Sequence, residues 1–224
     1  MKKISVIIPT LNEASCIASC LDSLAVMRRR GHEVIVVDAG SIDATVSLSE
    51  AYTDIVLNTS KGRSRQLNLG AEKASGDMLV FLHADTVLPE NADDILSNLM
   101  TEDEVWGRFD VRLSGTKPIF RVIEYLMNQR SRLSAIATGD QAIFVSRSLF
   151  DRVGGFSKID LMEDIELSAK LKKIKRPVCL KQTVQSSSRR WEKNGISKTI
   201  LKMWLLRLRF ALGEKTERLA REYE

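Results

Sequence analysis

The sequence lacks the features that would assign it to several large classes of protein. No stretch approaches the roughly 20 apolar residues that span a bilayer, which argues against a membrane-spanning protein. The three cysteines, Cys16, Cys20 and Cys179, have no zinc-binding spacing, and reduced thiols are expected. No G-x-G-x-x-G follows the first predicted strand and no G-x-x-x-x-G-K-[ST] occurs, which argues against dinucleotide-binding Rossmann and P-loop proteins.

The residues that are present suit one globular domain with a net positive charge. Of the 224 residues 44% are hydrophobic, and the 34 lysines and arginines exceed the 29 acids to give a net charge of +5. This charge favours an anionic ligand, and a phosphate-bearing substrate, nucleic acid and an acidic membrane surface all fit it. The amino-terminal MKKISVIIPT is interpreted as a strand rather than a signal peptide because Asn12 and Glu13 follow at once. A cytoplasmic protein is therefore predicted, with peripheral contact to the inner face of the membrane left open.

Short apolar runs alternate with helical patterns in the first third of the chain. Strands are expected at residues 4–9, 33–40, 54–58 and 77–83, and helices after Asn12, after Asp43 and over residues 64–73. Asn12 and Asp43 are residue types that cap helices. Such β-α-β-α alternation predicts an α/β protein with a Rossmann-like, mostly parallel central sheet covered by helices on both faces.

The pattern changes after residue 100. Apolar and polar residues alternate over 105–113, which predicts a half-buried and possibly antiparallel strand. The segments expected after it are a helix at 118–133, a strand at 141–146, a turn at 154–156, an acidic helix start at 162–167, a strand at 177–184 and a last helix at 195–213. Residues 1–192 are predicted to form the main domain and residues 193–224 an amphipathic helical appendage.

Polar residues follow three of the predicted strands at the point where each strand ends. In open parallel sheets ligands bind at the carboxyl ends of the strands, so these residues are candidates for a binding site. They are Pro9, Thr10, Asn12 and Glu13 after the first strand, Asp38 and Gly40 after the second, and His83, Ala84 and Asp85 after the fourth.

Six motifs together resemble a known family. IIPTLNEA, VVDAGSIDAT, GRSRQLNLGAEKASGD, FLHADT, GDQAIFVSRSLFDRVGGF and MEDIEL, in this order over roughly residues 4–191, are similar to motifs of the family-2 glycosyltransferases of the GT-A fold. Within that family the chain resembles the short soluble branch associated with arsenosugar biosynthesis. The resemblance implies inverting transfer from a nucleotide sugar, usually a UDP-sugar, to a small or lipid-linked hydroxyl acceptor with the help of Mg²⁺ or Mn²⁺.

The resemblance also implies roles in nucleotide binding. Asp38 would accept the N3 hydrogen of uracil, although an Asx-turn or a helix cap is an alternative for this aspartate. Asn12 and Glu13 would lie near the ribose, with helix capping as the alternative for Asn12. In KGRSRQLN the basic residues at the helix start form an anion environment or else a solvated basic turn. We expect Arg63 to contact the diphosphate and Gln66 of the same motif to lie in the nucleotide site.

The stretch FLHADT departs from the family pattern. Family members usually carry Asp-x-Asp here, with the last carboxylate on a metal that bridges the diphosphate, and this chain has His83-Ala84-Asp85. Mg²⁺ and Mn²⁺ prefer oxygen ligands and complete their shells with phosphate and water, so Asp85 alone is predicted to hold the metal when nucleotide is present. His83 is predicted to be a hydrogen-bonding or sugar-facing residue, with a packed core histidine as the alternative.

Glycosyl transfer requires a base for the proton of the acceptor hydroxyl. Glu163 and Asp164 supply adjacent carboxylates at a predicted helix start, where capping by Asp164 and dipole compensation by Glu163 are the alternatives. By resemblance to the Glu-Asp motif of the family, Asp164 is predicted to be the base. Asp140 would then line the pocket of the donor sugar or acceptor.

The carboxyl-terminal part gives two weaker predictions. Where processive family members have Gln-x-x-Arg-Trp, this chain reads Ser-Ser-Arg-Arg-Trp to Trp191, which argues against polymer synthesis. Arg190 is predicted to face the diphosphate, and Trp191 either stacks on a sugar or packs. The basic, apolar helix at 195–213 has three possible partners, namely the domain itself, a second chain in a homodimer, or anionic lipid.

Two other functions fit parts of the sequence. A sugar-phosphate nucleotidyltransferase shares the α/β architecture, but it would be expected to have a glycine-rich first loop in place of PTLNEA. A non-catalytic nucleotide-binding protein of the membrane surface would explain the last helix but not Asp38, Asp85 and Asp164 at separate strand ends and helix starts. Glycosyl transfer remains the main prediction, and no nucleic-acid partner is expected.

Overall fold

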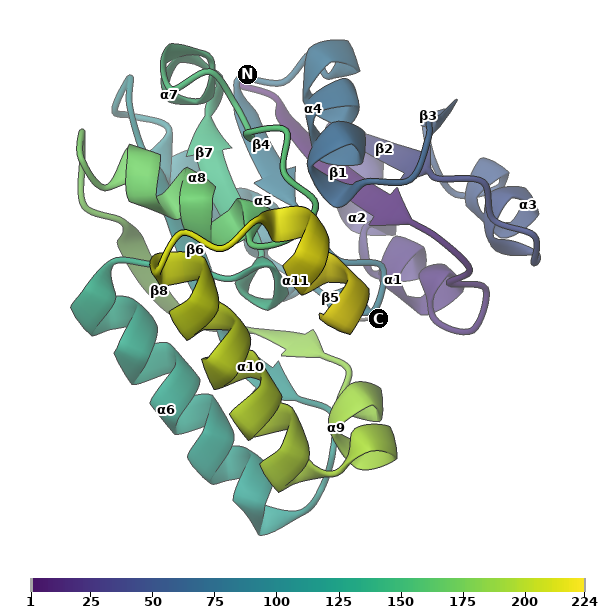
Figure 1. The fold of residues 1–224 in the computed structure, drawn as a ribbon. Helices are drawn as coiled ribbons and strands as arrows, with labels where there is room; N and C mark the ends of the chain where they lie inside the picture. The colour runs from purple at the N-terminus through teal and green to yellow at the C-terminus, as the bar shows by residue number, and fades with distance from the viewer. Residues whose placement is uncertain (1, 224) are drawn as a thin grey trace.

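A computed structural model describes residues 2–223 as one eight-stranded sheet flanked by helices (Figure 1). The strands are β1 Ile4–Thr10, β2 Glu33–Asp38, β3 Ile55–Asn58, β4 Met78–Phe81, β5 Thr86–Val87, β6 Trp106–Leu113, β7 Ile143–Ser146 and β8 Val178–Ser186. The helices are α1 Ile17–Ser23, α2 Ala25–Arg29, α3 Thr45–Glu50, α4 Arg63–Lys73, α5 Ala92–Leu99, α6 Pro118–Ser134, α7 Arg147–Arg152, α8 Glu163–Leu171, α9 Arg189–Asn194, α10 Ile196–Ala211 and α11 Thr216–Tyr223, with a short 3₁₀ turn η1 at Gly139–Gln141.

The sheet has a parallel half and a mixed half. In the order β3-β2-β1-β4-β7-β6-β8-β5, the first four strands are parallel. Strand β7 runs antiparallel to both β4 and β6, β8 is parallel to β6, and β5 is antiparallel to β8. This arrangement confirms the predicted α/β class with a mostly parallel sheet and a small antiparallel element.

Two hydrophobic layers lie on the two faces of the sheet. One contains α1, α2 and α5 packed on Val6, Val36 and Val80, and the other contains α4, α7 and α8 packed on Ile7 and the alternate residues of the same strands. Since side chains alternate between faces along a strand, central strands covered on both sides must be apolar throughout. This is why residues 34–37 are all apolar and residues 4–9 are apolar except for the buried Ser5.

Strand β6 differs from the prediction of a half-buried strand. Its first four residues are buried on both faces, because β6 lies between β7 and β8, and they include the fully buried Arg108. The guanidinium of Arg108 pairs with Asp110 and donates to Ser131 Oγ at 3.1 Å and to the Asn128 carbonyl at 3.0 Å. Because Asn128 and Ser131 belong to α6, this buried network fixes α6 against the sheet.

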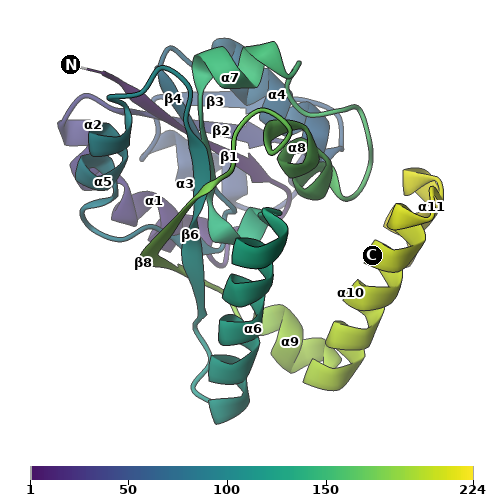
Figure 2. The same ribbon diagram turned by 90° about the vertical axis from the view of Figure 1, so that its left-hand side faces the viewer.

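The carboxyl-terminal segment consists of two helices where one was expected. Figure 2 shows α10 and α11 standing beside the domain, with α9 between α6 and the start of α10. At its start α10 packs through Ile196 and Ile200 on α6, and near its end Leu206 packs with Leu161 and Met162 before α8. Among residues 2–223 no helix is long and apolar enough to cross a membrane.

Candidate active site

Asp38 builds the turn that follows β2. Its Oδ1 accepts hydrogen bonds from Thr10 Oγ1 at 2.9 Å and Ser41 Oγ at 2.5 Å, and its Oδ2 accepts from the amides of Gly40 and Ser41 at 2.9 and 2.7 Å. A carboxylate has about four lone-pair sites, so all are used, and the residue is only 1% exposed. Asp38 therefore adopts the Asx-turn that the sequence left as an alternative, and its contact with uracil stays a prediction.

Asn12 does not cap a helix, which corrects that alternative. Its backbone has a positive φ of 56°, and α1 begins only at Ile17. The side-chain oxygen accepts from the Ile42 amide at 2.9 Å while the Asn12 amide donates to Ser41 Oγ at 2.8 Å. Asn12 thus ties the turn after β1 to the turn after β2, where a short polar side chain tolerates the left-handed conformation. At the next helix the N-cap residue is Ala44 rather than the expected Asp43, although the Asp43 side chain does accept the Thr45 amide at 3.0 Å from one position earlier.

Gln66 and Glu13 join the nucleotide-side turns to more distant parts of the chain. The buried Gln66 amide nitrogen donates to the carbonyls of Thr10 and Val37 at 2.9 and 2.8 Å, so it links the ends of β1 and β2. Glu13 forms an ion pair with Arg189 at 3.1 Å, across 176 positions of sequence. Glu13 therefore connects the turn after β1 to Arg189, whereas Gln66 holds the ends of β1 and β2 together.

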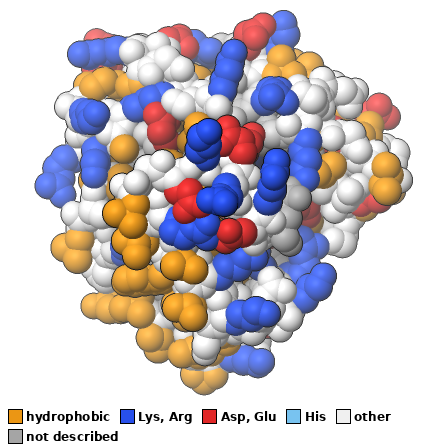
Figure 3. Space-filling model, in the orientation of Figure 1, with side chains coloured by type: hydrophobic (Ala, Val, Ile, Leu, Met, Phe, Trp, Pro, Cys, Tyr) orange, Lys and Arg blue, Asp and Glu red, His pale blue; other side chains and the backbone are white. Residues whose placement is uncertain are grey.

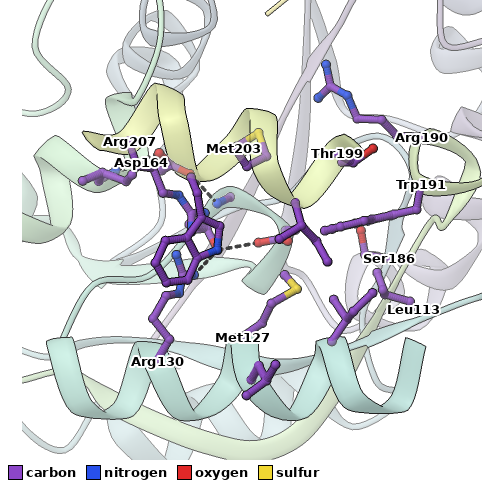
Figure 4. A pocket seen from close by; sticks show the side chains of 18 of the residues that line it. Leu113, Met127, Arg130, Asp164, Ser186, Arg190, Trp191, Thr199, Met203 and Arg207 are labelled. Carbon is purple, nitrogen blue, oxygen red and sulfur yellow. Dashed lines mark hydrogen bonds between the residues drawn. The ribbon is translucent and has the colours of Figure 1, made fainter. Parts of the chain in front are cut away.

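A cavity of about 840 Å³ lies between α6 and α10 and reaches Arg63 and Asp85 (Figure 4). This is within the range of about 300–1,000 Å³ typical of small-molecule sites. Among the predicted site residues, the lining contains Arg63, His83, Asp85, Asp140, Asp164 and Arg190. The predicted residues that do not line it are Pro9, Thr10, Asn12, Glu13, Asp38, Gly40, Gln66, Ala84 and Glu163.

Three carboxylates and one histidine share the inner end of the cavity. Burial and the neighbouring Glu13 raise the pKa of Asp85, which has no ion-pair partner among the described residues. Burial also raises the pKa of Asp140, against the hydrogen bond that its Oδ1 accepts from Thr138 Oγ1 at 2.6 Å. Burial lowers the pKa of His83 to about 3, with Arg63 and Arg190 adding to the effect, so His83 is neutral at physiological pH.

His83 and Ala84 are held close to the protein. Gly139 approaches the imidazole so closely that a Cβ at this position would lie 2.2 Å from His83 Nε2. Ala84 is buried in the hydrophobic layer below, so only its backbone is available to a ligand. The packed alternative for His83 is thus partly correct, since its ring both packs on Gly139 and borders the cavity.

Glu163 and Asp164 point in different directions. Glu163 is buried, its Oε1 lies 3.6 Å from Arg63 Nη1, and burial raises its pKa against the effect of that arginine. Asp164 borders the cavity, and its carboxylate accepts the amides of Gly139 at 2.8 Å and Ile165 at 2.7 Å. The residue before α8, Met162, has a positive φ of 67° and makes no side-chain cap. Of the two acids, Asp164 is therefore the one that faces open space.

Several residues of the cavity were not found from the sequence. Arg130 of α6 and Arg207 of α10 approach the carboxylates from opposite walls, as Figure 4 shows. The Nε atom of each is buried and has no hydrogen-bond partner in the described part of the chain, and burial together with Arg207 lowers the pKa of Arg130 to about 10. The two arginines are 77 positions apart on helices whose relative placement no local pattern indicates, so no sequence signal identifies this pair.

Arg190 and Trp191 lie at the opposite end from Arg130. The Arg190 guanidinium lies 3.8 Å from the ring centroid of Tyr223 in α11 and also hydrogen bonds to its hydroxyl. Trp191 packs with Leu113 and Phe120 and also lines the cavity, so packing is observed and stacking on a sugar stays a prediction. The carboxyl-terminal segment thus borders the candidate site directly.

No group of three or more histidine, cysteine or acidic side chains in residues 2–223 could hold a metal ion by itself. The unpaired and half-buried Asp85 carboxylate nevertheless has the chemistry that Mg²⁺ and Mn²⁺ prefer. These residues fit a metal that takes most of its ligands from a bound phosphate and water, with Asp85 as its protein ligand.

The fold and the site together define an α/β protein of GT-A type, with polar turns at the carboxyl edge of a mostly parallel sheet. Residues 5–159 match the family described as Glycosyl transferase family 2. The chain belongs to this family.

Two relatives illustrate the similarity. A PGL/p-HBAD biosynthesis glycosyltransferase of Mycobacterium bovis (strain BCG / Pasteur 1173P2) is 30% identical over 171 residues, which cover 68% of this chain and 62% of that protein. An uncharacterized glycosyltransferase of Haemophilus influenzae is 26% identical over 180 residues, covering 75% of this chain and 61% of that protein. The chain thus spans about three fifths of the length of these relatives.

Solved structures share the fold. Staphylococcus aureus TarS 1-349 in complex with UDP-GlcNAc has a TM-score of 0.65 at 19% identity, over 83% of this chain and 58% of that chain. Glucosyl-3-phosphoglycerate synthase of Mycobacterium tuberculosis, in complex with Mn²⁺, UDP and phosphoglyceric acid, has a TM-score of 0.59 at 20% identity, over 83% and 69% of the two chains. At these identities the likeness concerns the fold, which is the GT-A fold that the sequence predicted.

Proposed function

We propose that this protein transfers a sugar, with inversion, from a nucleotide-diphosphate sugar to a hydroxyl acceptor. The observation that carries the proposal is the convergence of Asp85, Asp140 and Asp164 with Arg63 on one cavity. Family membership supports glycosyl transfer over the alternative of nucleotidyl transfer. The UDP-sugar and Mn²⁺ complexes of fold neighbours support UDP and a divalent metal for the donor side.

The proposed chemistry uses Asp164 as the base. Its carboxylate takes the proton from the acceptor hydroxyl, the acceptor oxygen bonds to the anomeric carbon, and the bond from that carbon to the diphosphate oxygen breaks. Attack opposite to the leaving group inverts the anomeric centre, and the nucleoside diphosphate departs with the electron pair. Since Asp164 already receives two backbone amides, its carboxylate is oriented before the acceptor arrives.

The charge of the leaving group requires a positive partner. When bound through Asp85, Mg²⁺ or Mn²⁺ would supply electrostatic stabilisation of the diphosphate. Arg63 lines the same end of the cavity, and we propose that it contacts the diphosphate, with Arg190 as a second cation once Tyr223 gives way. Membership of the arsenosugar branch, and hence an arsenical acceptor, stays a prediction from the sequence motifs.

The test of this function is Asp164→Asn. A positioned general base contributes roughly 10²–10⁴-fold to rate and little to donor affinity, so we expect transfer or donor hydrolysis to fall at least about 100-fold. UDP binding with Mn²⁺, measured by calorimetry, should remain unchanged. Asn keeps an oxygen for one of the two amides, which limits the effect on folding.

Asp160→Asn is the matched control, because Asp160 is an exposed acid four positions earlier and does not line the cavity. Its activity should equal that of the wild type. Near-normal transfer by Asp164→Asn would assign the base to Glu163 or Asp140 instead. Absence of donor hydrolysis by the wild type, with several nucleotide sugars and metals, would contradict glycosyl transfer itself.

A further inference from the structure

Most of the cavity lies beyond the part that a nucleotide would occupy. The residues of the turns after β1 and β2 do not line it, and its inner end begins at Arg63, His83 and Asp85. From there it extends between α6 and α10 as far as Trp191. The interval from Arg207 to Ile200 along α10 corresponds to roughly 10 Å at about 1.5 Å per residue. The cavity therefore has room for a ligand other than the nucleotide.

The walls of this outer part are apolar. Side chains from α6, α9 and α10 form them, namely Ile123, Leu126, Met127, Trp191, Ile200 and Met203. Trp204 of α10 also lines the space and is 70% exposed. Figure 3 shows hydrophobic side chains gathered at the lower left, where α6 and α10 lie, next to the charged groups at the centre. Apolar surface left open in this way marks a binding site.

The junction between the apolar part and the carboxylates is polar. Arg130 and Arg207 face it from the two helices, each with a buried Nε that has no partner within residues 2–223. Buried donors of this kind are normally satisfied, so an oxygen-bearing group is expected between them. One end of the cavity thus suits a polar head with hydroxyls, and the other suits an apolar chain.

We propose that the acceptor is an amphiphile, whose apolar chain lies between α6 and α10 and whose hydroxyl reaches Asp164. This inference deepens the proposed function and rests on it for the reaction, but the binding of an amphiphile can be tested without a donor. A chain of about eight carbons would fill the roughly 10 Å between Arg207 and Ile200, given C–C bonds of about 1.5 Å in a zigzag.

The outer face of α10 is also apolar, and it offers a control. Leu201, Leu205, Leu208 and Leu212 are exposed there and do not line the cavity. A lipid surface or a second copy of the chain would contact this outer face, whereas a single acceptor chain would contact the inner one. Leu126 and Leu208 form a matched pair, because they are 59% and 58% exposed and only Leu126 borders the cavity.

The experiment measures binding of n-alkyl β-glucosides, from butyl to decyl and below their micellar concentrations, by calorimetry and by tryptophan emission. Two of the three tryptophans, Trp191 and Trp204, line the cavity. Each added methylene should tighten binding about 3–4-fold until the chain reaches about eight carbons, since a buried CH₂ contributes about 0.8 kcal/mol. Leu126→Gln should weaken binding of the octyl compound about tenfold, and Leu208→Gln should leave it unchanged.

The outcomes separate this proposal from the proposed function. A flat chain-length series, or equal weakening in both variants, overturns the amphiphilic acceptor. Equal weakening would instead indicate the outer face, to be followed by flotation with anionic vesicles and by measurement of the oligomeric state. Chain-length-dependent binding without any sugar transfer would support the apolar ligand and contradict the proposed glycosyl transfer. Transfer only to acceptors without an apolar chain would support glycosyl transfer and contradict the amphiphilic acceptor.

Discussion

None of the three acids that line the cavity forms an ion pair within the described residues, and Asp85 also lacks short hydrogen bonds such as those that Asp140 and Asp164 accept. Glu13 pairs with Arg189 and Glu163 with Arg63, but Asp85 receives only a long hydrogen bond of 3.5 Å from Thr86 Oγ1. Burial of a carboxylate costs free energy, and in Asp85 no ion pair with another side chain offsets that cost. A cation that arrives with the ligand would compensate this cost.

Asp85→Ala should therefore abolish the tightening of UDP binding by Mn²⁺. We expect the wild type to bind UDP at least about tenfold more tightly with Mn²⁺ than without, a gain of about 1.4 kcal/mol, and the variant to show no such gain. The reason is that the acids near Asp85 are engaged elsewhere, Glu13 with Arg189 and Asp140 with Thr138, and His83 stands where a second aspartate would be. Calorimetric titration of UDP with and without the metal measures the effect.

His83→Ala is the companion variant. Because the imidazole packs on Gly139, its removal should leave most of the metal-dependent gain in place. Loss of the gain in His83→Ala together with its retention in Asp85→Ala would identify the histidine as the ligand. The comparison needs no knowledge of the acceptor.

At the scale of elements, the pairing of β6 with α6 depends on a buried charge. Arg108 joins the strand to Asp110, Ser131 and Asn128, and Arg132 of α6 also pairs with Asp110. A charged side chain in this position must keep its partners, because an unpaired buried charge is strongly destabilising. Since α6 forms one wall of the cavity, the network also positions the site.

Arg108→Ala should lower the free energy of unfolding by about 3 kcal/mol, because it leaves several buried polar groups without their donor. Arg112→Ala is the control, since Arg112 is exposed on the same strand. We expect that control to change stability by less than about 0.5 kcal/mol. Urea unfolding followed by circular dichroism measures both. Equal stability of the two variants would contradict a structural role for the network.

The elements that could be predicted from the sequence are those with local signals. Buried parallel strands such as residues 4–9 need continuous apolar runs, and the helix start at Arg63 has its charges beside Gly62. The burial of Arg108 was missed, because a strand in isolation does not reveal that β7 and β8 flank it. Likewise the sequence does not show that the Asp38 carboxylate is fully hydrogen bonded within the protein, because one of its donors, Thr10, lies on another strand.

The sequence predicted the acidic residues of the candidate site but not the arginines on the helices that enclose it. Asp85, Asp140 and Asp164 stand next to strand ends and a helix start, where short motifs identify them. Arg130 and Arg207 lie within helices, at positions that resemble any solvated arginine. Their approach follows from the path of α9 and α10 back along α6, which is a property of the whole chain.

At the scale of the molecule, α10 is fixed mainly at its two ends. Ile196 and Ile200 pack on α6 at one end and Leu206 packs beneath α8 at the other, with the cavity between them. A helix with few buried side chains opens more readily than the sheet that it covers. The carboxyl-terminal helices therefore contact the domain at both ends of α10, and the cavity separates α10 from the domain between these two contacts.

Hydrogen exchange should reveal this attachment. We expect the amides of α10 to exchange at least about tenfold faster than those of α6, which is held to β6 by the Arg108 network. Octyl β-glucoside should slow exchange in α10 and leave α4 unchanged, because α10 borders the outer cavity and α4 does not. Equal protection of α10 and α6 in the free protein would contradict the expectation. Mass spectrometry of peptic fragments gives the required resolution.

The position of Tyr223 has a practical consequence. This residue stacks on Arg190 and borders the cavity, whereas β1 starts at Ile4, at the end of the sheet opposite to the candidate site. Any segment joined after Tyr223, whether an affinity tag or a fluorescent fusion, would emerge beside the entrance and compete with ligands for it. A tag joined before Lys2 would instead emerge on the far side, so amino-terminal fusions are the safer choice for assays of this protein.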